Sequence, residues 1–357
     1  MLADFLFSFQ SFSTFFNLFS YISFRSGLAL IFAFFIVFFI MPYWITFQNR
    51  LFPSGQPIRS DGPVTHFSKE GTPALGGVLI IFSIVISTIL WTSSFSKFSY
   101  IVILSFLLFG LLGFSDDYLK IKYRRGVSSK IKFLFQIIIT LFLLYLINQY
   151  IIDLTRLYLP FFKNFSFELG FFYIFFAIFV IVGSTNATNL TDGLDGLVSM
   201  PLIFVFLTFA VFSYIIGNSI YSDYLLLNFV PSSAELVIVC TASIGALLAF
   251  LWFNSHPAEI FMGDTGSQSL GGSLAVISIL LKQEFVLAIA GGLFVIEAIS
   301  VSIQVIYFRF TKKRFFLMAP LHHHYEKKGI SEQKIVIRFW IVGFIFCLLA
   351  LSLLKIR

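Results

Sequence analysis

Long, uninterrupted runs of apolar residues divide this chain of 357 residues and decide what it can fold into. A run of about 20 apolar residues is the length that an α-helix needs to cross a bilayer. Strands of a membrane barrel would instead alternate apolar and polar residues in short segments. The sequence therefore predicts ten membrane-spanning helices, over residues 24–47, 75–94, 98–115, 131–151, 169–186, 197–217, 235–253, 266–282, 285–308 and 335–355.

The composition agrees with a membrane protein. Hydrophobic residues make up 58% of the chain and charged residues only 11%, whereas about a quarter of the residues of a soluble domain are charged. Residues 1–22 are rich in Phe and Ser and lack the basic start of a signal peptide, so we expect an interfacial helix there. The expected fold class is all-α, a polytopic membrane protein whose residues 1–357 form a single transmembrane domain.

The distribution of Lys and Arg predicts the orientation in the membrane. Loops that follow odd-numbered spans carry 16 of the 24 basic residues, the opposite side carries seven, and Arg338 lies at the start of the tenth span. Cytoplasmic loops are enriched in Lys and Arg. We therefore expect both termini on the outer side. The net charge of +7 follows from this topology, and nucleic acid is not an expected partner.

Five polar clusters border the apolar runs, all on the predicted cytoplasmic side. A charged side chain inside a bilayer costs about 2.5–3.5 kcal/mol on insertion scales, so such clusters indicate a functional site. We expect the active site to be built from the loops that carry them, at about residues 48–74, 116–130, 186–196, 254–266 and 309–334.

Two of these clusters could hold a divalent cation. Asp116 and Asp117 end the third span, and Lys120 is close enough along a continuing helix to reach either carboxylate. Asp264 lies at the start of the eighth span, where backbone N–H groups also favour a phosphate. Carboxylates together with substrate phosphates are the ligands that Mg²⁺ prefers. A solvated helix end for the aspartate pair and a helix cap for Asp264 are the alternative interpretations.

A third cluster combines amides and carboxylates. Asn186, Asn189, Asp192 and Asp195 recur every three residues, so on a helix they move gradually round one side. Asn and Asp also favour caps and turns, because they bond to nearby backbone, and this accounts for one or two of the four.

The last two clusters carry cations and imidazoles. Lys69 precedes a Gly-rich stretch that alone could be a turn. The three successive histidines at 322–324 cannot all face one point, so proton transfer, phosphate contact and plain solvation stay open for them. Glu297 and Gln304 lie seven residues apart on one face of the ninth span, and for Glu297 a buried structural role is as well supported as catalysis.

Taken together, the motifs resemble the phospho-N-acetylmuramoyl-pentapeptide transferases, a family of the polyprenyl-phosphate N-acetylhexosamine 1-phosphate transferase superfamily. The motifs that carry the resemblance are Lys69–Gly77, Asp116-Asp117-Tyr-Leu-Lys120, Asn186–Gly196, Asn254–Ser267 and His322–Glu326. The chain departs from the family at Ala74, where Thr is common, so a hydroxyl contact at this position does not carry over.

The resemblance implies transfer of phospho-N-acetylmuramoyl-pentapeptide from UDP-N-acetylmuramoyl-pentapeptide to undecaprenyl phosphate, which gives lipid I and UMP with Mg²⁺ as cofactor. It also implies a place in the bacterial cytoplasmic (inner) membrane, with the active site at the cytoplasmic face. The sequence does not define the oligomeric state, and a homodimer is one option.

The resemblance also assigns roles to residues. The expected catalytic residues are Asp116, Asp117, Asp264 and His323, with Asp264 as the first metal ligand and Asp117 as a second candidate. The expected substrate-binding residues are Lys69, Asn189, Asp192, Asp195, Asn254, Phe261, Gln304, His322 and His324. Phe261 is a candidate stacking partner for uracil. Lys120 and Lys132 are candidates for steering the lipid phosphate, since cations attract anionic headgroups. Direct attack by the lipid phosphate is favoured over a covalent phospho-enzyme, although a carboxylate could serve in either.

Three other functions compete with this prediction. An N-acetylglucosamine 1-phosphate transferase would share the acidic clusters, although the Lys69–Gly77 loop and the intact histidine run favour the muramoyl substrate. A lipid or nucleotide-sugar transporter would place its site near the midplane between repeats, and no repeat is visible. A scaffold without chemistry explains single motifs better than five together.

Overall fold

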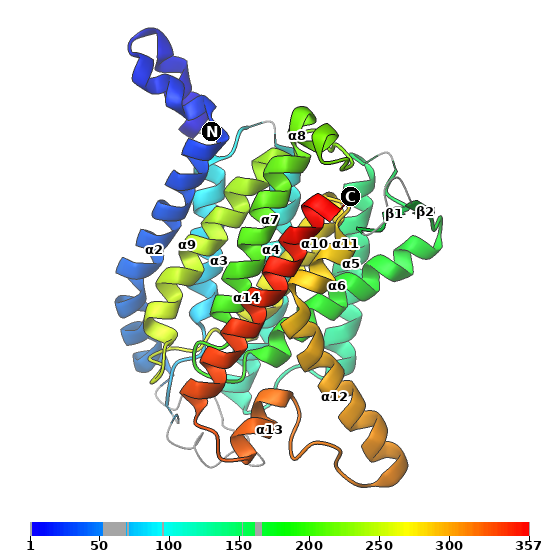
Figure 1. Ribbon diagram of the computed structural model, residues 1–357. Helices are drawn as coiled ribbons and strands as arrows, with labels where there is room; N and C mark the ends of the chain where they lie inside the picture. The colour runs from blue at the N-terminus through cyan, green and yellow to red at the C-terminus, as the bar shows by residue number, and fades with distance from the viewer. Residues whose placement is uncertain are drawn as a thin grey trace.

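The computed structural model describes residues 2–52, 69, 71–94, 96–151, 153–160 and 166–356, which form a bundle of helices (Figure 1). The long helices are α2 (Ile22–Leu51), α3 (Gly76–Trp91), α4 (Lys97–Tyr123), α5 (Ser129–Asn148), α6 (Phe172–Thr191), α7 (Ser199–Ile216), α9 (Leu236–Asn254), α10 (Gly263–Leu280), α12 (Gly292–Thr311) and α14 (Glu332–Ile356). The short ones are α1 (Leu2–Phe7), η1 (Ser8–Ser11), η2 (Thr14–Ser20), α8 (Ser219–Tyr224), η4 (Ser233–Glu235), α11 (Glu284–Ala290) and α13 (Leu321–Lys327). The predicted fold class, an all-α polytopic membrane protein, is confirmed.

The predicted spans lie on helices of the structure, but these helices differ in length and one span is interrupted. Within the described residues, eight helices are long and apolar enough to cross a membrane: α2, α4, α5, α6, α7, η4 with α9, α12 and α14. The helix α3 is shorter, with 16 residues. The prediction of one helix over 285–308 is wrong, because Gly291 separates α11 from α12 with non-helical backbone angles. Hydropathy cannot detect this break, since the residues on both sides of it are apolar.

Two further segments differ from the prediction. Residues 2–20 form α1, η1 and η2 rather than one helix, and Ser8 and Ser13 bond to nearby backbone groups in place of a continuous helix. Between α5 and α6 the chain forms an antiparallel hairpin of β1 (Arg156–Tyr158) and β2 (Ser166–Glu168), in which Leu157 lies opposite Phe167. Strands of three residues are too short for an alternating pattern to reveal them.

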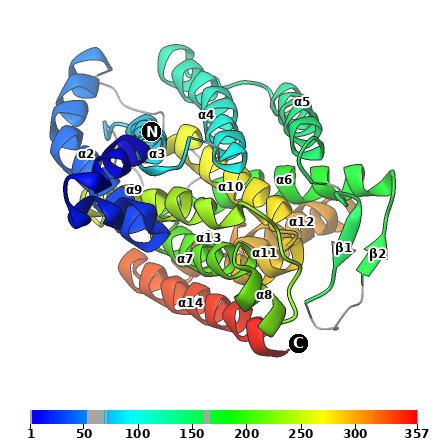
Figure 2. The same ribbon diagram turned by 90° about the horizontal axis from the view of Figure 1, so that it is seen from above.

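The helix α10 lies at the centre of the bundle and is surrounded by the other helices when seen from above (Figure 2). Of its 18 residues, 17 are buried. Small residues allow this, because the Ser269 hydroxyl donates to the Phe106 carbonyl at 2.7 Å and Ser273 bonds to Ser105 at 2.8 Å. A polar helix is stable inside an apolar bundle when neighbouring helices bond to its hydroxyls in this way.

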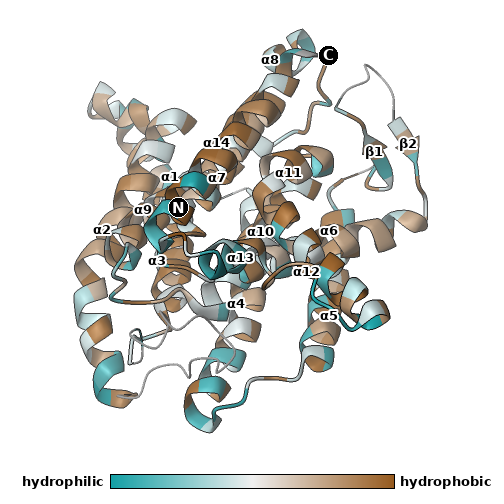
Figure 3. Cartoon of the chain, turned by 60° about the horizontal axis from the view of Figure 1, so that its bottom comes forward, coloured by the Kyte–Doolittle hydropathy of each residue, from teal (hydrophilic) through white to brown (hydrophobic). Residues whose placement is uncertain are grey.

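The two ends of the bundle differ in what they carry. Both chain termini lie at one end, and α13 lies at the other (Figure 1). Coloured by hydropathy, the helices are brown along their length, and hydrophilic residues gather at their ends and on α13 (Figure 3). The termini share one end, as the charge pattern requires. Their placement outside the cell stays a prediction, as does the single domain.

Candidate active site

Three carboxylates from two helices meet where α4 ends and α10 begins. Asp116 and Asp117 lie in the last two turns of α4, and Asp264 is the second residue of α10. Carboxylate oxygens from all three lie within 4.8 Å of one another, and all three residues are buried. Gly113 permits this approach, because a Cβ built on it would lie 2.3 Å from the Asp264 carbonyl oxygen. The structure therefore brings together two acidic motifs that lie far apart in the sequence.

Two ammonium groups lie among these carboxylates. Lys120 Nζ lies 2.7 Å from Asp116 Oδ2 and 2.9 Å from Asp264 Oδ1, which shows the reach expected from helical spacing. Lys132 Nζ, from the first turn of α5, lies 2.8 Å from Asp116 Oδ2 and 2.7 Å from Asp264 Oδ2. The lysine side chains keep 26% and 18% exposure, whereas Asp116 keeps 1%. The cations thus form the solvent-facing side of a buried acidic cluster.

Asp117 has a different environment from the other two carboxylates. Its Oδ1 accepts the Asp264 backbone N–H at 3.1 Å, and its Oδ2 accepts the Thr265 N–H at 2.8 Å and the Thr265 hydroxyl at 2.7 Å. The two N–H groups belong to the first turn of α10, where backbone N–H groups have no partner within the helix. Asp117 therefore caps α10 from another helix and fixes the position of Asp264.

A chain of amides extends from Asp264 into the bundle, and the sequence pattern singled out only one of them, Asn186, and not Gln136 or Gln268. Gln268 donates to Asp264 Oδ2 at 3.0 Å, and Gln136 donates to the Gln268 carbonyl oxygen at 3.1 Å. Asn186, in turn, donates to Gln136 at 2.9 Å. The sequence signal for this chain was the presence of amide side chains inside predicted spans, because a buried amide needs hydrogen-bond partners.

Two residues of the predicted substrate-binding set, Asn189 and Asp192, lie beside this centre. Asn189, in the last turn of α6, donates to the Ser267 hydroxyl at 2.9 Å. Asp192 follows the last residue of α6, so the predicted loop at 186–196 begins only there. Burial, together with the nearby charges of Asp264 and Asp117, raises the pKa of Asp192 to about 8. Asp192 is therefore held close to its neutral form.

A second ionic network surrounds Lys69 and Asp195. Lys69 Nζ lies 2.7 Å from Asp195 Oδ1 and 2.6 Å from Glu332 Oε1, while His256 Nδ1 lies 3.0 Å from Asp195 Oδ2. Glu332 also accepts the Asp195 backbone N–H at 2.8 Å. Sequence reasoning missed Glu332 and His256, because nothing local connects the first turn of α14 to Lys69. This network joins four segments of the chain at one point.

Asn254 and the residues around Phe261 hold the loops together. The Asn254 side chain accepts the Gly196 N–H at 3.0 Å and donates to the Ile260 carbonyl at 2.8 Å. The Phe261 N–H donates to the Pro73 carbonyl at 2.8 Å, and the Gly76 N–H donates to the Phe261 carbonyl at 3.0 Å. The segment after Lys69 is thereby fixed against the start of α10. Residues 53–68 and 70 of the predicted loop at 48–74 lie outside the described residues.

The three histidines have three different partners. His322 is fully buried, with Nδ1 3.4 Å from Glu297 Oε1. His323 Nδ1 lies 2.7 Å from Glu326 Oε2, and His324 Nδ1 accepts the Leu317 N–H at 3.1 Å. Partial burial lowers the pKa of His324, in agreement with a neutral ring that accepts a hydrogen bond. The expectation that the histidines do not converge on one point is confirmed.

Gln304, a predicted substrate-binding residue, bonds to the segment that connects α12 to α13. Its carbonyl oxygen accepts the N–H groups of Phe315 at 3.1 Å and Phe316 at 2.9 Å. These bonds shape the chain between α12 and α13. A nucleotide-binding role for Gln304 stays a prediction.

The donor set of the acidic cluster fits a magnesium ion. Mg²⁺ binds carboxylate oxygens and retains positions for water or phosphate. Asp116 and Asp264 direct oxygens at two partly exposed ammonium groups, which are cations of the kind a metal could displace. Asp117 has both oxygens engaged by α10, so Asp264 fits the role of metal ligand better than Asp117 does.

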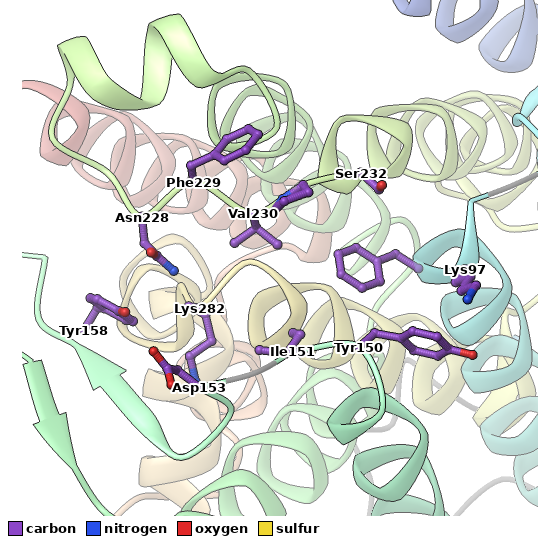
Figure 4. A pocket seen from close by; sticks show the side chains of 12 residues that line it. Lys97, Tyr150, Ile151, Asp153, Tyr158, Asn228, Phe229, Val230, Ser232 and Lys282 are labelled. Carbon is purple, nitrogen blue, oxygen red and sulfur yellow. The ribbon is translucent and has the colours of Figure 1, made fainter.

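A cavity of about 490 Å³ lies at the other end of α10 and is separate from this centre (Figure 4). Lys97, Tyr150, Asp153 and Lys282 contribute to its lining, and Lys282 Nζ donates to the Leu154 carbonyl at 2.6 Å. None of the predicted site residues lines it. The cavity is therefore not the site of the predicted chemistry.

Residues 99–282 match the glycosyl transferase family 4. Together with the apolar helices of the bundle, this match places the chain in the class of membrane-embedded transferases. Curated phospho-N-acetylmuramoyl-pentapeptide-transferases of Rickettsia felis and Rickettsia prowazekii are each 52% identical over 345 residues, covering 96% of this chain and 96% of the relative. That of Rickettsia akari is 51% identical with the same coverage. The chain belongs to the phospho-N-acetylmuramoyl-pentapeptide-transferase family.

Proposed function

We propose that this protein transfers phospho-N-acetylmuramoyl-pentapeptide from UDP-N-acetylmuramoyl-pentapeptide to undecaprenyl phosphate, forming lipid I and UMP at the cytoplasmic face of the bacterial inner membrane. The observation that carries the proposal is the meeting of Asp116, Asp117 and Asp264 with Lys120 and Lys132 at one end of the bundle. One substrate is a lipid and the other a water-soluble nucleotide. Their phosphates can meet only at the membrane surface, where the helices that carry these residues begin and end.

The reaction forms one P–O bond and breaks another. An oxygen of the lipid phosphate attacks the sugar-proximal phosphorus of the UDP substrate, and the bond from that phosphorus to the bridging oxygen of UMP breaks. Both reactants are anions, so positive charge must stabilise the transition state. Asp264 would hold Mg²⁺, which neutralises charge on the diphosphate when bound. Asp117 holds the start of α10 and thereby positions Asp264.

The lysines and Asp116 act on the lipid phosphate in this proposal. Lys120 and Lys132 are partly exposed and carry the positive charge that attracts the phosphate headgroup. Asp116 Oδ2 lies between both lysines and is the candidate to accept a proton from the lipid phosphate. Direct attack then needs no covalent intermediate.

The remaining residues form the nucleotide and sugar surface. Lys69, Asp195 and Asn254 connect the loops on one side, while Asn189 and Asp192 lie next to the acidic centre. Phe261 is half-buried beside them and is the candidate to stack on uracil. His323, with His322 and His324, is the candidate to contact the diphosphate or the peptidyl sugar.

The test is an assay of the purified, full-length protein in detergent with undecaprenyl phosphate and Mg²⁺. We expect release of UMP and formation of lipid I from UDP-N-acetylmuramoyl-pentapeptide, and neither from UDP-N-acetylglucosamine. UMP release only from UDP-N-acetylglucosamine would show that the substrate assignment is wrong. No UMP from either nucleotide would refute the proposed reaction.

A further inference from the structure

A fully buried carboxylate on α12 contacts the histidine-bearing helix α13. Glu297 Oε2 accepts the Leu321 backbone N–H at 2.7 Å, and Glu297 Oε1 lies 3.4 Å from His322 Nδ1. The N-cap residue of α13, Pro320, makes no side-chain capping bond. Since the first N–H groups of a helix need partners, Glu297 supplies from another helix the cap that α13 lacks.

The imidazole of His322 is confined on its other side by the turn that follows α6. A Cβ built on Gly193 would lie 2.3 Å from His322 Nε2 and 3.0 Å from its Cε1. Gly193 adjoins Asp192, a carboxyl group close enough to Asp264 and Asp117 to interact with them electrostatically. The ring of His322 therefore lies between Glu297 and the edge of the acidic centre, and a side chain at position 193 would clash with it.

The contact between Glu297 and His322 lies just outside hydrogen-bond geometry. Among the described residues, both ring nitrogens of His322 and Glu297 Oε1 lack a hydrogen-bond partner, although both side chains are 0% exposed. Unsatisfied buried polar groups are costly. A shift of a few tenths of an ångström would close the contact, and the bond at Nδ1 would decide which ring nitrogen carries the proton.

We infer that Glu297 is a positioning residue for the transferase reaction: it holds α13 at its first turn and orients His322 with Nδ1–H toward the carboxylate. Nε2 of His322 then faces the Asp192–Gly193 turn as an acceptor. This inference rests on the proposed function. Glu297 itself contacts no substrate and acts through His322 and through the placement of α13.

The test compares Glu297→Gln with a matched control, Glu284→Gln. The carboxamide oxygen of the first variant keeps the bond to the Leu321 N–H, but its NH₂ group faces His322 Nδ1 and favours the opposite tautomer. Glu284 is also a buried carboxylate, bonded to Tyr173 beyond the far end of α10. We expect Glu297→Gln to lower kcat at least tenfold with little change in KM and Tm. We expect Glu284→Gln to lower Tm and leave kcat unchanged.

Two further measurements separate positioning from general stability. In a double-mutant cycle, Glu297→Gln and His322→Gln should be strongly non-additive in kcat, because both remove one interaction. Nitrogen-15 spectra of histidine-labelled protein should show that the protonated nitrogen of His322 changes from Nδ1 to Nε2 in Glu297→Gln. Wild-type kcat in that variant, additive losses, or an unchanged tautomer would each overturn the inference. The spectra need no substrate, so they distinguish a wrong orientation of His322 from a failure of the proposed function.

Discussion

Two groups of buried charges lie at opposite ends of the bundle and differ in how they are balanced. At the end that holds the termini, Arg25 of α2 pairs with Glu235 of η4, with Nη2 to Oε1 at 2.6 Å and Nη1 to Oε2 at 2.9 Å. This is one cation and one carboxylate in a bidentate pair, with side chains 7% and 13% exposed. A closed pair of this kind serves the fold.

The acidic centre at the other end has an excess of negative charge. Among the residues that the structure describes, Asp116, Asp117 and Asp264 form ion pairs with two cations, Lys120 and Lys132, and these lysines remain partly exposed. Folding alone gives no reason to bury more carboxylates than cations, because unpaired buried charge is costly. The comparison teaches that a balanced pair can be explained by the fold alone, whereas the unbalanced cluster supports our proposal that a further cation binds there.

The largest effect that would sharpen this comparison comes from Asp264→Asn. The substitution keeps the shape of the side chain and removes the charge that the proposed cation requires. We expect UMP release to fall roughly 1,000-fold, equivalent to about 4 kcal/mol of transition-state stabilisation. An unfolding curve of the same sample serves as the control and should change little. Near-normal turnover would contradict the assignment of Asp264 as a metal ligand.

Breaking the balanced pair of Arg25 and Glu235 should have the opposite effect: it should lower stability and leave activity unchanged. Arg25→Met leaves Glu235 buried without its cation, and we expect the free energy of unfolding to fall by about 3 kcal/mol with kcat unchanged. Adding Glu235→Leu to the same chain should restore part of the lost stability. A loss of activity larger than the loss of folded protein would show that this pair does more than stabilise the fold.

For the ionic network around Lys69 we expect an effect on activity of intermediate size. Glu332→Gln weakens the hold on Lys69 Nζ, which lies 2.6 Å from Glu332 Oε1. We expect KM for the UDP substrate to rise about tenfold, or about 1.4 kcal/mol, with kcat nearly constant. Glu168→Gln on the exposed β2 strand is the control and should leave both constants as they are. A loss in kcat alone would mean that Glu332 does not act through nucleotide binding.

The smallest effect is a dependence of stability on pH. Burial raises the pKa of Asp192 from 3.8 to about 8, so the folded protein keeps a proton that the unfolded chain releases. Rising pH therefore favours unfolding between these two values, and the loss is complete above the higher one. In metal-free buffer, Tm of Asp192→Asn relative to wild type should increase across this range and then stay constant. A difference in Tm that does not vary with pH would contradict the raised pKa.

Much of the fold and of the acidic centre could be predicted from local patterns. Apolar runs of membrane length identify helices directly, and Asp116, Asp117 and Asp264 stand out because charge beside such a run is costly. The break at Gly291 could not be predicted, since hydropathy is a sum that a single non-helical residue does not alter. The hairpin at Arg156–Tyr158 and Ser166–Glu168 was likewise too short for its pattern to be recognised.

The partners of the site residues were harder to predict than the residues themselves. Asn254 was predicted to bind substrate, yet its side chain bonds the backbone at Gly196 and Ile260. The contact of Lys69 with Glu332 joins residues 263 positions apart. Helical spacing predicts neighbours within one helix, such as Lys120 and Asp116, but long-range contacts depend on how helices pack against one another.

The most direct test of the unbalanced cluster measures cation binding without turnover. Mn²⁺, used as a spectroscopic substitute for Mg²⁺, is titrated into the purified wild-type protein and into Asp264→Asn, and electron paramagnetic resonance counts the bound ions. The account predicts one ion bound per wild-type chain at this site and loss of that ion in the variant. Equal binding by the two proteins would show that these carboxylates do not form the cation site.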